Sequence, residues 1–437
     1  MGDELDACTT ATSRCLAAIA ATDGEGARVF TQVYAHSALL DAAAADRRRA
    51  SGRALSPIDG RVIAVKDLFD VLGHTTWAGS LVRRDAPPAS ADAQVVSRLR
   101  RAGAVIIGKT NMTEFAYSGI GLNPHYGTPA NPFGRAMRRR IPGGSSSGAA
   151  VAVADGMAEM GLGTDTGGSV RIPAALCGLV GWKPTARRIS LDGVWPLAPS
   201  LDSVGVIAKT VRSCAEADAV LTAPPAAAAV LQPHLRLARL RGYIEDDMEP
   251  TVRRAYEQAL LRLAAADVEL VDVAVPALER VPREHPGVVI AGREAFDVHQ
   301  ALLDRSADLY DPRVRSRLEL GRNITLERYT AAQATRHAVQ QLAAQALEPF
   351  DAWLLPTVTR VAAPFSAVES DDDYLEVNRA LLRNTSLINF LDGCAISLPC
   401  QERDEPPVGL SIAALSGRDS HALAVAQRLE PFVTAPV

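Results

Sequence analysis

The stretch IPGGSSSGAAVAVADGMAEMGLGTDTGGSVRIP, residues 141–173, decides the fold, and it holds two clusters of glycine and serine. The clusters lie at 143–148 and 166–169, and a small-residue helical segment and an apolar run separate them. Glycine tolerates positive φ and lets backbone N–H groups approach a ligand, while serine supplies a reactive or hydrogen-bonding hydroxyl. Both clusters therefore indicate a site rather than core packing.

The first cluster matches three common motifs only in part. A phosphate-binding loop needs Lys and Ser or Thr after its second glycine, where this chain has Ala149 and Ala150. A Gly-x-Ser-x-Gly nucleophile elbow centred on Ser146 must follow a buried strand, but three arginines, an isoleucine and a proline precede it. A flexible Gly/Ser linker is the third interpretation.

The second cluster is the better candidate for a nucleophile. An apolar strand-like run ends at Thr164, and the chain then turns sharply through Asp165 to Ser169. Such a turn can gather N–H donors around a serine, and acyl transfer needs donors of this kind to hold the charge of a tetrahedral intermediate. The candidate oxyanion-hole residues are Thr166, Gly167, Gly168 and Ser169.

Lys66 is the candidate base, because it ends the apolar segment 62–65. On its own such a lysine is more often a residue at the edge of the surface, since buried lysines are rare. A strand-ending lysine, a GGSSSG turn and a later TGGS turn together resemble the amidase signature family. The resemblance extends from Gly60 to about Ala413.

Other segments similar to this family lie at 108–115, 127–132, 178–185, 200–205, 355–357 and 407–410. The chain departs from the family pattern at three positions. Trp182 stands where phenylalanine is usual, Cys400 occupies a turn that is usually smaller or glycine-rich, and Ser411 replaces a common glutamine. These departures concern the lining of the pocket and not the chemistry.

The resemblance implies a catalytic triad in which Ser169 is the nucleophile, Ser145 bridges, and neutral Lys66 is the general base. A free lysine has a pKa of about 10.4, so the site must lower the pKa of Lys66 to about 7 for the amine to accept a proton near neutral pH. Burial beside hydroxyl and amide groups can do this.

Four further residues have supporting roles by resemblance. The peptide bond between Gly144 and Ser145 is expected to be cis, and Ser146 lies beside it. Asp165 and Arg171 match residues that brace the loop in the family. The alternative for these two residues is an ordinary surface ion pair.

The order of the elements predicts the α/β class, and the resemblance implies a large mixed sheet covered on both faces by helices. We expect one domain over residues 1–437. Within it, 1–58 form N-terminal helices that wrap the core, 59–210 hold the signature core, and 211–437 complete the sheet and wall the pocket. The acidic stretch 364–373 is the best candidate for disorder. Strands are expected at 62–65, 104–108, 204–208, 235–240, 268–275, 353–356, 395–398 and 408–413.

Composition narrows the class of protein. The 437 residues are 48% hydrophobic and 22% charged, which is typical of a globular protein, and the net charge of −4 argues against binding to nucleic acid or an anionic membrane. The N-terminus resembles no secretory signal, and no run of 18 apolar residues is present. Six cysteines without metal spacing predict reduced thiols, and together these features favour a cytoplasmic location.

We therefore expect a serine amidohydrolase that cleaves the C–N bond of a small neutral amide, anilide or aryl carbamate (urethane), with some ester hydrolysis. The expected partner is this substrate, with no nucleic acid and no membrane, and a homodimer is left open. No cofactor or metal is expected, because no ligand cluster has metal spacing. Candidate pocket residues, all aromatic and in loops near the motifs, are Tyr117, Tyr126, Phe133 and Trp195, with Trp77 beside them.

Two other function classes stay open at this point. One is the amidase-like subunit of a glutamine-dependent amidotransferase, against which the acidic charge balance counts. The other is a Ser-His-Asp esterase that uses Ser146 with His299, His337 or His421 as its base.

Overall fold

The strands of this protein form one mixed sheet of 11 strands within residues 6–222, 229–266 and 268–434, which are the residues that the computed structural model describes. The strand order is β1-β3-β2-β4-β6-β5-β10-β11-β9-β7-β8. The strands are β1 (Phe30–Val33), β2 (Val62–Lys66), β3 (Val105–Thr110), β4 (Met160–Thr164), β5 (Val180–Lys183), β6 (Val204–Ala208), β7 (Leu235–Arg241), β8 (Val268–Ala274), β9 (Ala352–Pro356), β10 (Cys394–Pro399) and β11 (Gly409–Ala414).

Strand β2 shows how the sheet is covered on both faces. Successive side chains of a strand point to opposite faces. Val62 and Ala64 belong to the core cluster that includes helix α5 (Ser147–Ala154), whereas Ile63 and Val65 belong to the cluster that includes α4 (Gln94–Arg101). By this alternation, Lys66 lies on the same face as Ala64, which is the face that α5 covers.

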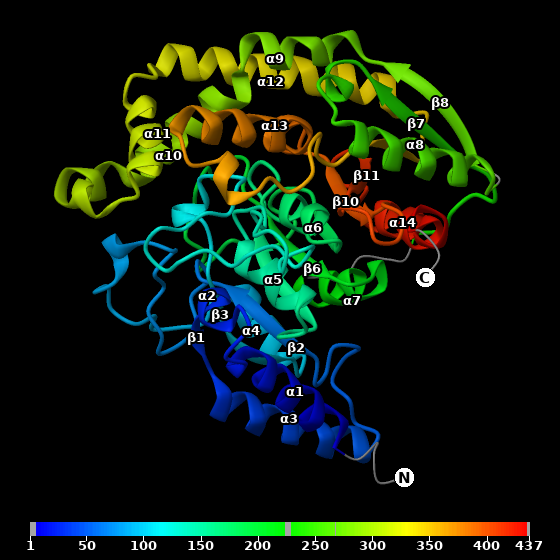
Figure 1. Ribbon diagram of the computed structural model, residues 1–437. Coiled ribbons are helices and arrows are strands. Elements are labelled where there is room, and N and C mark those ends of the chain that lie inside the picture. Colours follow the sequence, from blue (N-terminus) through cyan, green and yellow to red (C-terminus); the bar gives the residue numbers. More distant parts are fainter. Residues whose placement is uncertain (1–5, 223–228, 267, 435–437) are drawn as a thin grey trace.

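Figure 1 shows the helices around this sheet, with the N-terminal helices at one end of the molecule and the helices of residues 286–390 at the other. Near the middle of the sheet, α5 and α6 lie close to β6 in this view. The remaining α-helices of the described residues are α1 (Ala7–Ala20), α2 (Gly26–Val29), α3 (Ala35–Ala50), α6 (Arg171–Leu176), α7 (Val211–Leu221), α8 (Pro250–Ala264), α9 (Arg280–Glu284), α10 (Pro286–Ser306), α11 (Pro312–Arg322), α12 (Leu326–Leu347), α13 (Asp371–Phe390) and α14 (Asp419–Val433).

The α/β class with a large mixed sheet is confirmed, and every strand expected from the sequence is present to within one or two residues at each end. One strand falls where only helices were expected. Residues 30–33 form β1, which pairs antiparallel with β3 at the edge of the sheet. Four residues are too few to show a period of two, so the neighbouring helices dominate the pattern there.

The prediction of disorder at 364–373 is wrong. This stretch contains a short 3₁₀ helix and the beginning of α13. The Ser370 hydroxyl accepts a hydrogen bond from the Asp373 N–H, and three aspartates occupy the first helical turn. Carboxylates are favourable at this end of a helix because the helix dipole is positive there. The acidic run therefore begins a helix.

We expect Ser370→Ala to lower the free energy of unfolding by about 1 kcal/mol, because the substitution removes the N-cap of α13. Urea denaturation followed by circular dichroism measures this change. The exposed mid-helix Ser316 of α11 is a matched control, and Ser316→Ala should change stability by less than about 0.5 kcal/mol. Equal effects of the two substitutions would contradict a capping role.

Candidate active site

Lys66, at the end of β2, is fully buried, and its Nζ donates hydrogen bonds to two hydroxyls. The acceptors are Ser145 Oγ at 2.8 Å and Thr164 Oγ1 at 3.0 Å. Strands β2 and β4 are parallel neighbours, so their carboxyl ends lie together, and Thr164 is the last residue of β4. Ser145 precedes α5, which covers this face. The sheet therefore brings together the lysine and the first serine of the predicted triad.

The loop that carries Ser145 is held on both sides. The Thr113 N–H donates to the Ser145 carbonyl at 3.1 Å, and the Gly144 N–H donates to the Gly119 carbonyl at 2.8 Å. The peptide bond between Gly144 and Ser145 is cis, as expected. A Cβ on Gly144 would lie 2.7 Å from the Gly121 backbone, so only glycine fits at this position.

Ser169 lies in the turn between β4 and α6, and 4% of its surface is exposed. The Ser146 N–H donates to its carbonyl at 3.2 Å, which joins the two glycine-serine loops. Within the described residues no hydrogen bond is recorded for Ser169 Oγ, whether to Ser145 or to another group. Catalytic hydrogen bonds are often long before the substrate binds, so the link from Ser145 to Ser169 stays a prediction.

The backbone N–H groups of the second loop differ in what they bind. The Gly168 N–H is donated to Asp165 Oδ1 at 2.8 Å. Those of Thr166, Gly167 and Ser169 have no recorded acceptor in the described part of the chain. Gly168 has a φ of 132°, and a Cβ there would lie 2.2 Å from Thr385 Oγ1. The conformation thus requires glycine at 168, and three amides of this loop have no acceptor among the described residues.

Asp165 and Arg171 form a buried ion pair, so the surface alternative is wrong. Arg171 donates to both carboxylate oxygens, at 2.9 and 3.0 Å, and neither side chain is exposed. Burial acts to raise the pKa of Asp165, but the Arg171 guanidinium outweighs it, and the pKa falls to about 2. The carboxylate also accepts from the Gly168 and Val170 N–H groups. The pair therefore holds the turn in shape.

Helix α13 contributes two residues that the sequence did not indicate. Asn389 donates to the Asp165 carbonyl and to Oδ1, both at 3.0 Å, and it accepts from Arg171 at 2.7 Å. Thr385 Oγ1 donates to the Gly167 carbonyl at 2.7 Å. No motif marks these two positions, because they lie far along the chain from the loop they hold.

Asp202 is a third contributor, from a segment that resembles the family but had no assigned role. Its carboxylate accepts from Thr166 Oγ1 at 2.5 Å and from the N–H groups of Leu197 and Ala198. Burial raises the pKa of Asp202 to about 6, although these hydrogen bonds oppose it. Asp202 thus connects the Thr166 turn to the loop at 195–198.

Burial has the largest effect on Lys66 and lowers its pKa to about 7. The carboxylates of Asp165 and Asp202 act in the opposite direction, because negative charge favours the ammonium form. This result agrees with the value that a lysine base requires near neutral pH.

Ser146 has no histidine partner among the described residues. Its side chain is fully buried, and its hydroxyl donates to the Thr164 carbonyl at 3.5 Å. His299 Nδ1 pairs with the Tyr310 hydroxyl, His421 lies 3.4 Å from Asp351, and His337 is exposed on α12. The geometry therefore gives no support to a Ser-His-Asp esterase centred on Ser146.

The four aromatic residues predicted to line one pocket do not form one cluster. Tyr117 is buried under the Arg317 guanidinium, 4.2 Å from its ring centroid. Tyr126 stacks on Trp77 at 5.5 Å, and Phe133 is half-buried in its own loop. Trp195 packs against Phe115. The segments of Tyr117 and Trp195 are both hydrogen-bonded to the loops of the predicted triad, the first through Thr113 and Gly119 and the second through the Trp195 N–H and the Leu68 carbonyl.

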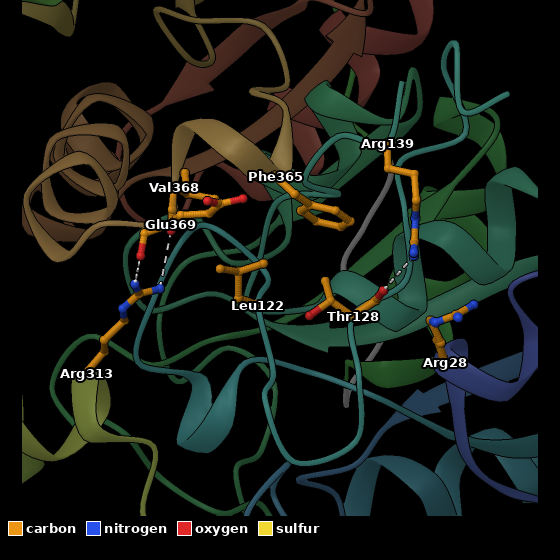
Figure 2. Close-up of a pocket in the computed structure, with 8 residues that line it drawn as sticks. All are labelled: Arg28, Leu122, Thr128, Arg139, Arg313, Phe365, Val368 and Glu369. Carbon is orange, nitrogen blue, oxygen red and sulfur yellow. Dashed lines mark hydrogen bonds between the residues drawn. The ribbon is translucent and has the colours of Figure 1, made fainter. Parts of the chain in front are cut away.

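Two cavities, of about 370 and 550 Å³, lie elsewhere. They share Leu122, Thr128 and Arg313, and no residue of the predicted triad lines either one. In Figure 2, Arg139 and Arg313 stand on opposite sides of the smaller cavity, and each arginine is hydrogen-bonded to backbone carbonyls. The protein's own carbonyl groups thus engage both arginines.

The described residues contain no group of three or more His, Cys, Asp or Glu side chains arranged to hold a metal ion. In the same residues, no helix combines the length and the apolar character needed to span a membrane. All six cysteines lie in the described part of the chain, and they are buried and free.

The low pKa of Lys66 predicts a specific dependence of stability on pH. Between pH 7 and 10.5 the folded state holds a neutral amine and the unfolded state a charged one, so stability rises with pH in this window. The wild-type protein should gain roughly 1.4 kcal/mol per pH unit relative to Lys66→Met between pH 7 and 9. Urea denaturation at several pH values measures the difference, and a difference independent of pH would contradict the assignment.

Comparisons with known proteins place this geometry in a family. The family model described as Amidase matches residues 10–423. The chain is 33% identical to a 2-amino-5-chloromuconic acid deaminase of Comamonas testosteroni, over 94% of this chain and 87% of that protein. It is 34% identical to a glutamyl-tRNA(Gln) amidotransferase subunit of Acidothermus cellulolyticus, over 94% and 88%. A crystal structure described as that of an amidase superposes with a TM-score of 0.87 at 31% identity, covering 98% of this chain and 96% of the other. The chain belongs to the amidase family, the amidase signature family that its sequence motifs resemble, and is a hydrolase acting on C–N bonds.

Proposed function

We propose that this protein is a serine amidohydrolase that cleaves a small neutral amide, anilide or aryl carbamate through an acyl-enzyme on Ser169. The observation that carries the proposal is the buried Lys66, whose pKa is lowered to about 7 and whose Nζ lies 2.8 Å from Ser145 Oγ. A neutral amine in contact with a serine hydroxyl is able to act as a general base near neutral pH.

In the proposed first step, Ser169 Oγ attacks the carbonyl carbon of the substrate. The Ser169 proton passes to Ser145 Oγ as the Ser145 proton passes to Lys66 Nζ. The free amides of Thr166, Gly167 and Ser169 are the candidates for holding the oxyanion, and we leave Gly168 out because Asp165 already accepts its N–H.

The same relay run in reverse completes the cycle. Lys66 returns a proton through Ser145 to the leaving nitrogen, and the C–N bond breaks to give the acyl-enzyme. Water then attacks the ester carbon and gives up a proton through Ser145 to Lys66. The bond between the acyl carbon and Ser169 Oγ breaks, and that proton returns through Ser145 to Ser169 Oγ. Because this route does not require nitrogen in the leaving group, some esters should also react.

A second candidate is the amidase-like subunit of a glutamine-dependent amidotransferase. The 34% identity to a glutamyl-tRNA(Gln) amidotransferase subunit favours it. The net charge of −4 gives this chain no excess of positive charge for binding tRNA. Affinity purification of the tagged chain from its own host separates the two: stable co-purifying subunits support the second candidate, and turnover by the isolated chain supports the first.

Ser169→Ala should abolish hydrolysis of a panel of nitroanilides, aryl carbamates and primary amides, with the fold unchanged by circular dichroism. Lys66→Ala and Ser145→Ala should be nearly as severe. The double variant Lys66→Ala/Ser145→Ala should lose little more than the worse single one, because residues of one relay act as a unit. Retention of more than a few per cent of activity by Ser169→Ala would show that another residue is the nucleophile.

The pH dependence of kcat/KM tests the base. Lys66 must be neutral to accept a proton, so kcat/KM should rise through about pH 7 and reach a plateau at alkaline pH. Asp202→Asn removes a charge that raises the pKa of Lys66, so it should move this limb to lower pH. A limb that stays in place or moves to higher pH in Asp202→Asn would exclude Lys66 as the titrating group.

A further inference from the structure

Four aromatic side chains from three segments that lie far apart in the sequence pack together. Phe115 lies 4.3 Å from the His299 ring, 5.3 Å from Tyr310 and 5.8 Å from Trp195, measured between ring centroids. The Arg83 guanidinium lies over the Trp195 ring at 3.9 Å. We call these four rings the aromatic cluster.

Two buried nitrogen atoms of the aromatic cluster have no hydrogen-bond partner among the described residues. They are His299 Nε2 and Trp195 Nε1, and the His299 side chain is fully buried. A buried polar atom without a partner costs about 1–3 kcal/mol, so two of them in one cluster require an explanation. A ligand atom that forms hydrogen bonds with both nitrogens would explain why neither has a partner in the protein.

The hydrogen bond of the other ring nitrogen, Nδ1, indicates whether His299 Nε2 is a donor or an acceptor. His299 Nδ1 lies 3.0 Å from the Tyr310 hydroxyl, which has no other recorded partner among the described residues. In the tautomer in which the Tyr310 hydroxyl donates to Nδ1, Nε2 carries the ring hydrogen. Burial, with the charge of Arg83, lowers the pKa of His299 to about 4, so the ring is neutral. Since the Trp195 nitrogen is also a donor, the cluster presents two unused N–H groups.

Hydrogen bonds connect the segments of the cluster to the loops of the triad at three places. Phe115 lies two residues after Thr113, whose N–H binds the Ser145 carbonyl. The Trp195 N–H binds the carbonyl of Leu68, two residues after Lys66. The loop that follows Trp195 is held by Asp202, which also accepts from Thr166. The cluster is thus positioned from both the base side and the oxyanion side of the site.

We propose that His299 Nε2 and Trp195 Nε1 bind an oxygen acceptor at the far end of the substrate's acyl group, which makes them specificity-determining residues. This inference rests on the proposed function. The preferred substrate is then an amide whose acyl part combines a flat apolar body, packed on Phe115, with a terminal carbonyl or carboxylate oxygen. The acyl group stays attached to Ser169 after the amine leaves, so we assign the two buried donors to the acyl group and not to the leaving group.

Matched primary benzamides test the proposal, because their leaving group is always ammonia. The probes are 4-acetylbenzamide, 4-carboxybenzamide and 4-isopropylbenzamide, where isopropyl has the shape of acetyl without its oxygen. Wild-type kcat/KM should favour acetyl over isopropyl by about tenfold, as expected for hydrogen bonds that would otherwise be unmade. A preference for the carboxylate over acetyl would identify an anionic group as the natural acceptor. For amides hydrolysed too slowly to time, the ratio of inhibition constants replaces that of kcat/KM.

His299→Leu and, independently, Trp195→Phe should each reduce the acetyl-to-isopropyl ratio several-fold. Trp195→Phe keeps an aromatic ring and removes only the donor, so it tests the idea even if His299→Leu fails to fold. The exposed His337→Leu is the matched control and should keep the wild-type ratio. Two results overturn this inference alone, provided that hydrolysis still requires Ser169. One is an acetyl-to-isopropyl ratio near one in the wild type, and the other is a ratio that is unchanged in both variants. Hydrolysis that survives Ser169→Ala overturns the proposed function instead.

Discussion

Lys66 is fully buried, and its amine donates a hydrogen bond to the Ser145 hydroxyl. The rest of the site depends on this contact. A buried ammonium group is costly unless it has partners that stabilise its charge. Two other buried lysines have such partners, because Lys109 forms an ion pair with Asp67 at 2.8 Å and Lys183 donates to two backbone carbonyls. The acceptors of Lys66 are instead hydroxyls, which are able to pass on a proton. The protein thus keeps this amine close to neutrality by burying it without a direct counter-ion.

The turn that carries Ser169 depends on residues remote in sequence. Arg171 is held by Asp165 from its own turn and by Asn389 from α13. Because Thr385 also fills the space beside Gly168, helix α13 acts as a template for the loop conformation. The run of aspartates that begins α13 therefore contributes to the site indirectly, by capping the helix that shapes it.

The sequence by itself determined the α/β class and the family, and it predicted the residues at the centre of the site. The family was recognisable because Lys66, Ser145 and Ser169 lie in motifs whose glycine spacing reflects local backbone geometry. The strands were predictable for a similar reason, since buried segments such as Val62–Lys66 show an apolar pattern along the chain itself.

Tertiary structure decided what lies around that centre. Thr385 and Asn389 reach the loops only through the packing of α13, and no local pattern marks them. Thr164 and Asp202 lie in recognisable segments, but only the pairing of strands and the folding of loops shows what they contact. The aromatic residues near the motifs separate for the same reason: Tyr126 stacks on Trp77, whereas Trp195 joins His299 from a distant helix. Contacts of this kind depend on how the chain crosses the sheet, and nearness in sequence says little about them.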